Sequence, residues 1–450
     1  MKIFNELAIK FKRSDWALNP EFGLIDTLLD HHSELIELLV PDVTKGTNAS
    51  EFGRKDTPTV EQIVRAAIFK EMKGLNYREL EYAQSDSRIC ATFIKLDERK
   101  PLSFQVLQKY ISKITPESLE KLMVEINRIA ISEGLEDVEK LRQDSTVVKA
   151  NIHYPTNNAL VWDCIKESHR LLKQLNEECD DLSYRDYTGS AKKTYFKINV
   201  TKSKDRRVEL FKKQLITFTK CINQVANSVK KRVVSPKGIA LQCVLEDLLP
   251  LMEQVYSMTY RKELLGEVVP NDEKLFSIYE RHTDIIVKGS REVDFGHKVS
   301  LAGGRSNLIL DCQILTGNPS DSTLYQPTLE RVIAHYQTVP RDSVTDGAYA
   351  SLDNVDYSLN HGITNVVFNK VVGSLKSHVT SKCMETRLKK WRSGIEAVIS
   401  NLKRGFDLFV CEWKGWIHFQ AKVLWSVIAY NFRVMTSIIL ERIQTQSALV

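Results

Sequence analysis

The chain has 450 residues, about three times the usual length of one domain, so we expect a core domain with added parts. Hydrophobic residues make up 43% and charged residues 27%, which excludes a wholly disordered, collagen-like or coiled-coil protein. The most apolar stretch, 423–440, is interrupted by Asn431 and Arg433, and the first residues lack the apolar segment of an export signal. We therefore expect a folded cytoplasmic protein that does not cross a membrane.

The cysteines and the charges are distributed unevenly enough to be informative. The eight cysteines form no Cys-x-x-Cys pair and have no His-rich neighbourhood, which argues against a zinc site and a disulfide scaffold. Residues 201–238 hold eleven Lys or Arg against two acids, a local net charge of +9, and residues 375–404 hold eight against two, a net of +6. Such segments indicate a polyanionic partner, although a solvated helix face has the same composition.

The first 135 residues are dominated by helical patterns. An apolar stripe from Val60 to Met72 predicts a helix, with Thr59 or Thr57 as its N-cap and Gly74 as its end. Two further short helical patterns follow within 77–88 and 103–114, the second capped by Ser103. Three short helices with tight connections are typical of a helix-turn-helix module and also of small bundles that do not bind DNA. We interpret residues 1–135 as an N-terminal helical region for DNA binding and dimerisation.

The pattern changes to strands from Leu141 onward. The β-branched segment LRQDSTVVKANIHY predicts two strands with a turn near Ala150, and further strands are predicted within 284–288, 297–303, 307–317, 343–349 and 363–369. Residues 161–279 have a helical pattern throughout, and the last hundred residues return to helix. We therefore predict an α/β protein, with a mixed-sheet core of residues 136–160 and 280–450 and a helical insertion of residues 161–279.

Two aspartates stand out by their place in this pattern. Asp144 lies within the first predicted strand, where a buried carboxylate is costly unless it is paired, hydrogen-bonded or bound to a metal. Asp346 precedes Gly347 at the carboxyl end of another strand, where open α/β sheets place their sites. Each also has an ordinary interpretation, as a surface-facing strand residue and as part of an Asp-Gly turn.

A glutamate stands out on a predicted helix near the C-terminus. The apolar residues of 384–402 recur at intervals of three and four, and the polar stripe beside them contains Lys389, Arg392, Glu396 and Lys403. An exposed ion pair would explain this stripe and would add only about 0.2 to 0.5 kcal/mol. Gly394 is harder to explain, since a glycine inside a helix costs about 1 kcal/mol relative to alanine. It indicates close approach of another backbone or of a ligand.

Two aspartates and a glutamate on separated segments suit one kind of chemistry. Phosphodiester cleavage by two Mg²⁺ ions needs hard oxygen ligands that hold the metals about 3.5 to 4 Å apart. Carboxylates on a central strand, on a neighbouring strand end and on a packing helix would converge at one edge of the sheet, and nearby Arg and Lys side chains would bind phosphates.

On these residues the sequence resembles bacterial insertion-sequence transposases of the Asp-Asp-Glu (DDE) type. Residues 58–114 resemble their end-binding region, QDSTVVKANIHYPTNNALVWD their first-aspartate block, and DFGHKVSLAGGRSNLILDCQILTGNPSDS with VTDGAYAS their second block. The third block of one large group reads Tyr-x2-Arg-x3-Glu-x6-Lys, and Arg392, Glu396 and Lys403 occupy its last three places. Lys389 stands where the Tyr is expected, which suggests a divergent, ISNCY-like branch.

The resemblance implies a ribonuclease-H-like catalytic core in which Asp144, Asp346 and Glu396 bind two Mg²⁺ ions, with Mn²⁺ as an alternative. It also implies cleavage at terminal inverted repeats, strand transfer of the 3′-hydroxyl ends into target DNA, a homodimer in the DNA complex, and a nucleoid-associated bacterial protein. The residues that it suggests as DNA contacts are Arg392, Lys403, Lys389, His297 and Lys298.

Two alternatives stay open at this point. A ribonuclease-H-like nuclease that cuts without joining would use the same metal site, and a sequence-specific DNA-binding regulator would keep the carboxylates in an inactive core. His297 and Lys298 also have a second interpretation, as surface residues of an edge strand.

Overall fold

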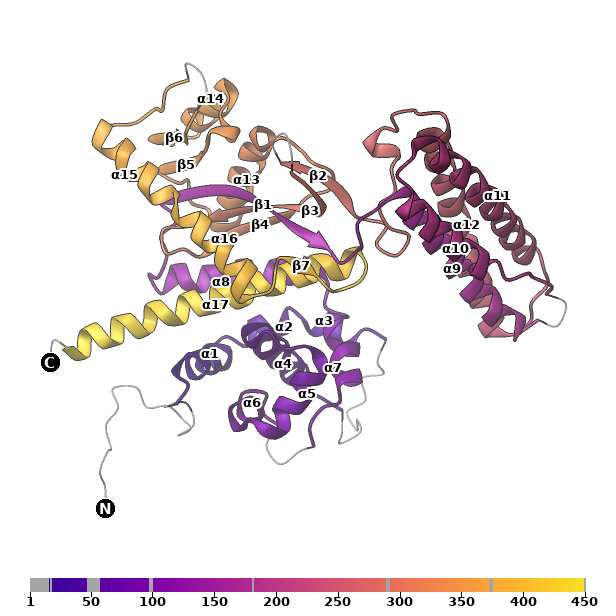
Figure 1. Ribbon diagram of the computed structural model, residues 1–450. Helices are drawn as coiled ribbons and strands as arrows, with labels where there is room; N and C mark the ends of the chain where they lie inside the picture. The colour runs from indigo at the N-terminus through magenta and orange to yellow at the C-terminus, as the bar shows by residue number, and fades with distance from the viewer. Residues whose placement is uncertain are drawn as a thin grey trace. The chain divides into compact units, whose positions relative to one another are not determined.

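The computed structural model describes residue 16 and residues 18–46, 57–96, 100–179, 182–288, 292–371 and 375–448. The chain divides into two compact units, Met1–Lys149 with Gly296–Val450, and Ala150–Phe295. Figure 1 shows the elements of both units, and each unit is described separately below.

Seven strands in the described residues form one mixed sheet: β1 (Lys140–Ala150), β2 (Asp284–Lys288), β3 (Glu292–Gly303), β4 (Ile309–Ile314), β5 (Asp342–Asp346), β6 (Asn365–Asn369) and β7 (Val410–Cys411). Their order is β2-β3-β1-β5-β6, with β4 also paired to β3 and β7 to β1. Strand β1 is antiparallel to β3 and parallel to β5, and β5 is parallel to β6. The predicted mixed α/β class is confirmed. The second strand predicted after Ala150 is wrong, because residues 151–156 form no strand and β1 alone runs for eleven residues.

Helices cover both faces of the sheet in the first unit. On one face lies α13 (Asp321–Tyr336), to which Gln143 of β1 donates hydrogen bonds, at 3.1 Å to the Leu324 carbonyl and at 2.7 Å to the Thr328 hydroxyl. On the other face α16 (Gly394–Gly405) and α17 (Trp416–Ala448) pack on Val148 and Leu301, with α17 alongside α8 (Pro116–Ser132) (Figure 1). This layering follows from the alternation of side chains along β1.

Helix α17 is long and apolar enough to cross a membrane by length and composition. Within Trp416–Thr445 its most apolar 18-residue window has a mean hydropathy of 1.5, but 67% of that window is buried inside the protein. Its Asn431 is fully buried and donates hydrogen bonds to Asn127 of α8 and to the Ile309 carbonyl of β4. These contacts are typical of the core helix of a folded domain.

The N-terminal part of the first unit is helical: α1 (Pro20–His31), α2 (Glu34–Glu37), α3 (Val40–Thr44), α4 (Val60–Lys73), α5 (Tyr77–Asp86), α6 (Arg88–Phe93) and α7 (Phe104–Ile111). Thr59 and Gln62 form a capping box at the start of α4, and Gly74 ends it in the left-handed conformation, with φ of 64°. Ser103 caps α7. The caps and the end of α4 predicted from the sequence are confirmed, whereas the helix-turn-helix interpretation stays a prediction.

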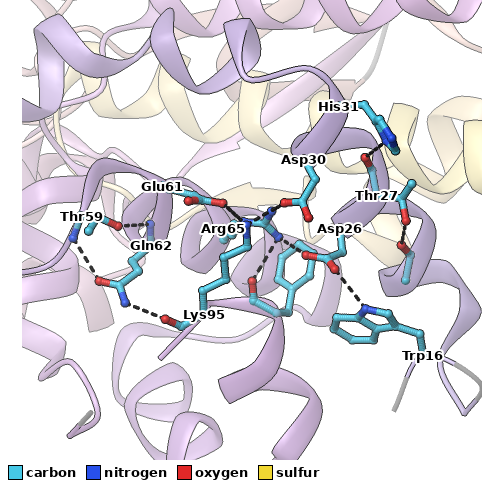
Figure 2. A network of polar contacts seen from close by, with 12 residues as sticks. Trp16, Asp26, Thr27, Asp30, His31, Thr59, Glu61, Gln62, Arg65 and Lys95 are labelled. Atoms are coloured by element: carbon cyan, nitrogen blue, oxygen red, sulfur yellow. Dashed lines mark hydrogen bonds and ion pairs between the residues drawn. The ribbon is translucent and has the colours of Figure 1, made fainter. Parts of the chain in front are cut away.

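A buried arginine ties these helices together (Figure 2). The guanidinium of Arg65 in α4 is fully buried and forms ion pairs with Asp26 at 2.6 Å, with Asp30 at 2.8 Å and with Glu61 at 2.8 Å. Lys95 pairs with Asp30 and Glu61 as well, both at 2.6 Å, and the Trp16 indole donates to Asp26 at 3.0 Å. Figure 2 shows these partners arranged around the guanidinium, with α1 on one side and α4 on the other.

The second unit consists mainly of helices: α9 (Asn157–Asn176), α10 (Thr188–Val200), α11 (Lys204–Val229) and α12 (Pro236–Thr259). They bury an apolar core of their own, which includes Ile165, Leu172, Phe218 and Met252. The chain leaves the first unit after Lys149 and returns to it at Gly296, and these two residues are direct partners in the β1–β3 ladder.

Candidate active site

Parallel pairing of β1 and β5 brings two aspartates to the same place on the sheet. Arg142 pairs with Val344, so continuing the register by two residues sets Asp144 of β1 beside Asp346, the last residue of β5. Their side chains then lie on the same face, because neighbours in a parallel ladder share a face. The Asp346 carboxylate accepts a hydrogen bond of 2.8 Å from the Gly347 amide.

Gly347 is required where it stands. A Cβ atom on this residue would lie 2.6 Å from the carbonyl oxygen of Lys370 and 2.9 Å from that of Asn369, too close for any side chain. The Asp-Gly pair therefore lets the end of β5 pass against the end of β6, which fixes the backbone from which Asp346 projects.

The third carboxylate lies just after a break between two helices. The sequence predicts one continuous helix through 384–402, and this is wrong: α15 (Lys382–Arg392) ends before Ser393, and α16 begins at Gly394. Gly394 is therefore the first residue of a helix, and Glu396 lies in the first turn of α16, where a negative charge is favourable. Arg392 is the last residue of α15 and is buried.

The guanidinium of Arg392 contacts all three carboxylates. One of its nitrogens, Nη2, donates to Asp144 at 2.9 Å and lies 3.7 Å from Asp346, and the other, Nη1, donates to Glu396 at 2.9 Å. The side chain of Arg392 is 6% exposed, while those of Asp144, Asp346 and Glu396 are 18%, 40% and 62% exposed. The cluster thus has a buried cation at its centre, and the exposure of its carboxylates rises from Asp144 through Asp346 to Glu396, which forms its solvent-exposed rim.

The electrostatics of this cluster favour a further cation. Burial raises the pKa of the Asp144 carboxyl; Arg392 and the Ser145 amide lower it, while Asp346 and Asp321 raise it, and the net result is a raised pKa. Three carboxylates around one guanidinium leave two uncompensated negative charges when all are ionised. Hard oxygen donors with excess negative charge are the ligands that Mg²⁺ prefers.

The donor set fits divalent ions held by few protein ligands at a time. In the parts of the chain that the structure describes, no three His, Cys, Asp or Glu side chains lie close enough together to hold one ion. Mg²⁺ is commonly bound through one or two carboxylates, with water and substrate phosphates completing its shell. Because the guanidinium lies among the three carboxylates, pairs of them rather than all three are suited to hold an ion.

Of the predicted basic contacts on the helices, Arg392 lies at the centre of this cluster, whereas Lys389 and Lys403 lie outside it. Lys389 pairs with Glu385 one turn earlier on α15, at 2.6 Å. Lys403 lies two turns beyond Glu396 on α16, with its ammonium 5.6 Å from the centre of the Phe409 ring. Both side chains are partly exposed, so both are accessible from the side of α15 and α16.

The predicted pair on β3 is buried. His297 has no exposed surface: its Nδ1 lies 3.0 Å from the Leu315 carbonyl, and its ring packs on Trp416 and Phe419. In this arrangement its ring cannot meet a phosphate. Lys298 is 7% exposed and forms an ion pair of 2.7 Å with Asp321.

Two residues near the cluster were missed from the sequence. Asp321, at the start of α13, accepts a hydrogen bond of 2.9 Å from Ser145, the neighbour of Asp144. Arg142 lies below the break between α15 and α16 and donates to the Trp391 carbonyl at 2.7 Å and to the Asn307 side chain. Arg142 is two residues before Asp144, so strand alternation could have indicated that the two share a face.

The comparison with known families adds an independent finding. Residues 287–432 match the family model described as a transposase DDE domain, which supports a DDE transposase family. The matched segment contains Asp346, Arg392 and Glu396 and does not reach Asp144. No curated protein and no solved structure matched the chain.

Proposed function

We propose that this protein is a DNA transposase that cuts at transposon terminal inverted repeats and transfers the 3′-hydroxyl ends into target DNA. The observation that carries the proposal is the meeting of Asp144, Asp346 and Glu396, from three separate elements, at the guanidinium of Arg392. Two of the three carboxylates lie within the segment that matches the transposase DDE domain, which makes a structural ion cluster a weaker explanation.

In this proposal the three carboxylates hold two Mg²⁺ ions, with Mn²⁺ as an alternative. When bound, the ions supply the Lewis acidity that activates the attacking oxygen and stabilises the leaving oxygen. Arg392 orients Asp144 and Glu396 through its two hydrogen bonds, and it is kept in the proposed contact set as the cation at the centre of the site. Lys389 and Lys403 bind the DNA backbone beside the site, whereas His297 is left out of the contact set because it is buried.

DNA binding in this proposal is supported by the exposure of the basic residues. All eleven Lys and Arg side chains within 201–238 are exposed, on α11 and the segments that flank it. Each Lys or Arg that neutralises a phosphate releases counterions, so affinity should fall steeply with salt. The short helices α4 to α7 are proposed to add sequence preference, as a helix-turn-helix-like module.

The assembly and location follow from the resemblance. Two transposon ends must be handled together, so we propose a homodimer in the DNA complex, acting in the bacterial cytoplasm on the nucleoid. The ISNCY-like assignment rests on Lys389 at the place of the family's Tyr, with Arg392, Glu396 and Lys403 in register.

The test is cleavage of a labelled duplex that carries the terminal sequence of the element, with Mg²⁺ or with EDTA. We expect metal-dependent nicking at the element end by the wild type, and its loss in Glu396→Gln while gel-shift binding survives. The matched control is Asp353→Asn, which removes an exposed acidic residue from the first turn of another helix, α14 (Leu352–Asn360), and should cleave normally.

The other outcomes identify the alternatives. Nicking without joining to supercoiled target DNA would indicate a ribonuclease-H-like nuclease. Binding without cleavage in any metal would indicate a DNA-binding regulator with an inactive core and would contradict the proposal.

A further inference from the structure

The break between α15 and α16 rests on a buried arginine of the central strand. Arg142 is 1% exposed, and its guanidinium donates to the Trp391 carbonyl at 2.7 Å and to the Asn307 side chain. The guanidinium carbon also lies 4.7 Å from the centre of the Trp391 ring. Arg142 therefore satisfies a carbonyl at the end of α15 and holds the ring of the same residue.

The next helix begins in direct contact with this guanidinium. A Cβ atom on Gly394 would collide with Nη1 of Arg142 and would lie 3.0 Å from its Cζ atom. Gly394 does not have a left-handed φ, so its backbone conformation would accept alanine. The need for glycine here comes from the space that Arg142 fills and not from the backbone.

Arg142 and Gly394 each lie two residues before one of the candidate metal-binding carboxylates. Arg142 precedes Asp144 by two residues on β1, and Gly394 precedes Glu396 by two residues on α16. Arg392, which bonds both carboxylates, lies between Trp391 and the break. A contact that fixes Arg142 against Trp391 and Gly394 therefore fixes the distance between the strand carboxylate and the helix carboxylate.

We infer that Arg142 is a positioning residue of the candidate active site, which sets Glu396 and Arg392 against Asp144 by packing its guanidinium into the space left by Gly394. This inference rests on the proposed function, since it assigns Arg142 a role in the arrangement of the metal-binding carboxylates. Arg142 itself contacts none of the three carboxylates.

Burying the charged side chain of Arg142 costs free energy, which argues that the residue has a geometric role. Its Nε atom is buried and has no hydrogen-bond partner among the described residues. Its charged guanidinium is also buried, which costs free energy of solvation. An apolar side chain would fill this volume without that penalty but could not bond the end of α15.

The experiment is a double-mutant cycle between the two residues, made in the full chain. Gly394→Ala, Arg142→Met and Arg142→Lys are made singly, and Gly394→Ala is combined with each Arg142 variant. Mn²⁺ affinity is measured by electron paramagnetic resonance, and the thermal midpoint of unfolding is measured for the same samples. The control is Gly189→Ala, because Gly189 also lies in the first turn of a helix, α10, but has open space at its Cβ position.

We expect Gly394→Ala to weaken Mn²⁺ binding by about 10- to 100-fold, as the loss of a supporting group around a metal site does. It should also lower the thermal midpoint, although alanine favours helix over glycine, whereas Gly189→Ala should raise the midpoint or leave it unchanged. In the Arg142→Met background the clash is gone, so Gly394→Ala should cause little further change in either quantity, and in the Arg142→Lys background, which keeps an atom near the Cζ position, its effect should be intermediate. Arg142→Lys should itself weaken Mn²⁺ binding, because its ammonium lacks the fork that reaches both acceptors.

Equal effects of Gly394→Ala with and without the Arg142 guanidinium would overturn the inference. So would normal Mn²⁺ affinity in both Arg142 single variants. Failure of the proposed function has a different signature: the wild type would neither bind Mn²⁺ nor cleave DNA, while the coupling in thermal midpoint would persist. In that case the contact would remain, but Arg142 would have no active site to position.

Discussion

Two arginines in this protein are each surrounded by three carboxylates, and the two clusters have different characters. Around Arg65 every carboxylate has a second side-chain partner: Lys95 pairs with Asp30 and Glu61, and the Trp16 indole donates to Asp26 as Figure 2 shows. Around Arg392, the described residues offer Asp144 and Asp346 no second hydrogen-bond donor except the backbone amides of Ser145 and Gly347. Among the described residues, the first cluster sets two cations against three acids and the second sets one against three.

Exposure separates the clusters in the same direction. The acids around Arg65 are 10%, 23% and 34% exposed and those around Arg392 are 18%, 40% and 62% exposed, so Asp346 and Glu396 are the two most exposed of the six. A ring of acids around an arginine therefore does not by itself indicate a catalytic site. The oxygen lone pairs and the negative charge that remain uncompensated decide whether the cluster can take a further cation.

The largest expected effect comes from removing the arginine of the cluster around Arg65, called the closed cluster below; the cluster around Arg392 is called the open cluster. Arg65→Met leaves three carboxylates without their buried partner, so the free energy of unfolding should fall by about 3 to 5 kcal/mol. Arg392→Met should cost less, because its carboxylates reach solvent. Urea unfolding measures both, with Arg170→Met as the control: Arg170 is 52% exposed and pairs with Glu167 on the same helix, so its loss should cost under about 1 kcal/mol. Equal losses for Arg65 and Arg392 would contradict the distinction between the clusters.

The next effect concerns metal binding to the open cluster. At Mg²⁺ a hundred times its dissociation constant, the wild type should gain about 2.7 kcal/mol of stability, because the ion binds only the folded state. Asp144→Asn should lose this gain, while Glu61→Gln, in the closed cluster, should keep it. Thermal unfolding with Mg²⁺ and with EDTA makes the measurement. A gain that survives in Asp144→Asn but not in Glu61→Gln would show that the metal binds the cluster around Arg65, and it would contradict the proposed site.

The smallest effect is a pH dependence of the closed cluster. Burial alone would raise the pKa of Glu61, but Lys95 and Arg65 outweigh it and hold the pKa below its ordinary 4.5. A lowered pKa means that the ionised Glu61 stabilises the fold above pH 4.5 and that this stability is lost as the pH falls through the folded-state value. Glu61→Gln should therefore cost about 1 kcal/mol or less at pH 7, and this deficit should vanish in acid. A deficit that grows on acidification would show that the pKa of Glu61 is raised in the folded state, contrary to this prediction.

Local signals in the sequence predicted much of the fold. Thr59, Gly74 and Ser103 mark helix ends through hydrogen bonds that depend on their own type, so these ends could be placed from the sequence. The strand segments were recognised by their β-branched composition. The second strand predicted after Ala150 failed because composition does not show whether a segment finds a partner, and the apolar period of 384–402 continued across the break at Ser393.

The candidate site was predictable in part, for a physical reason. Asp144, Asp346 and Glu396 could be selected by context and by resemblance, but their meeting depends on the parallel register of β1 and β5. Register is set by packing of the whole sheet and has no local signature here. The sequence pointed to a close contact at Gly394, but it gave no sign that the partner is the side chain of Arg142. Likewise His297 is of a residue type that often contacts phosphates, and only the fold shows that its ring is enclosed by Trp416 and Phe419.

The pairing of Lys149 with Gly296 has a consequence for how this chain tolerates change. The 146 residues of Ala150–Phe295 depart from and return to two paired positions of one antiparallel ladder, and within them α9 to α12 form one long connection between β1 and β2. The entropy of closing a loop grows only with the logarithm of its length, and each doubling adds about 0.6 kcal/mol. A lineage could therefore lengthen, shorten or exchange the helices of this connection at little entropic cost to the strand that carries Asp144.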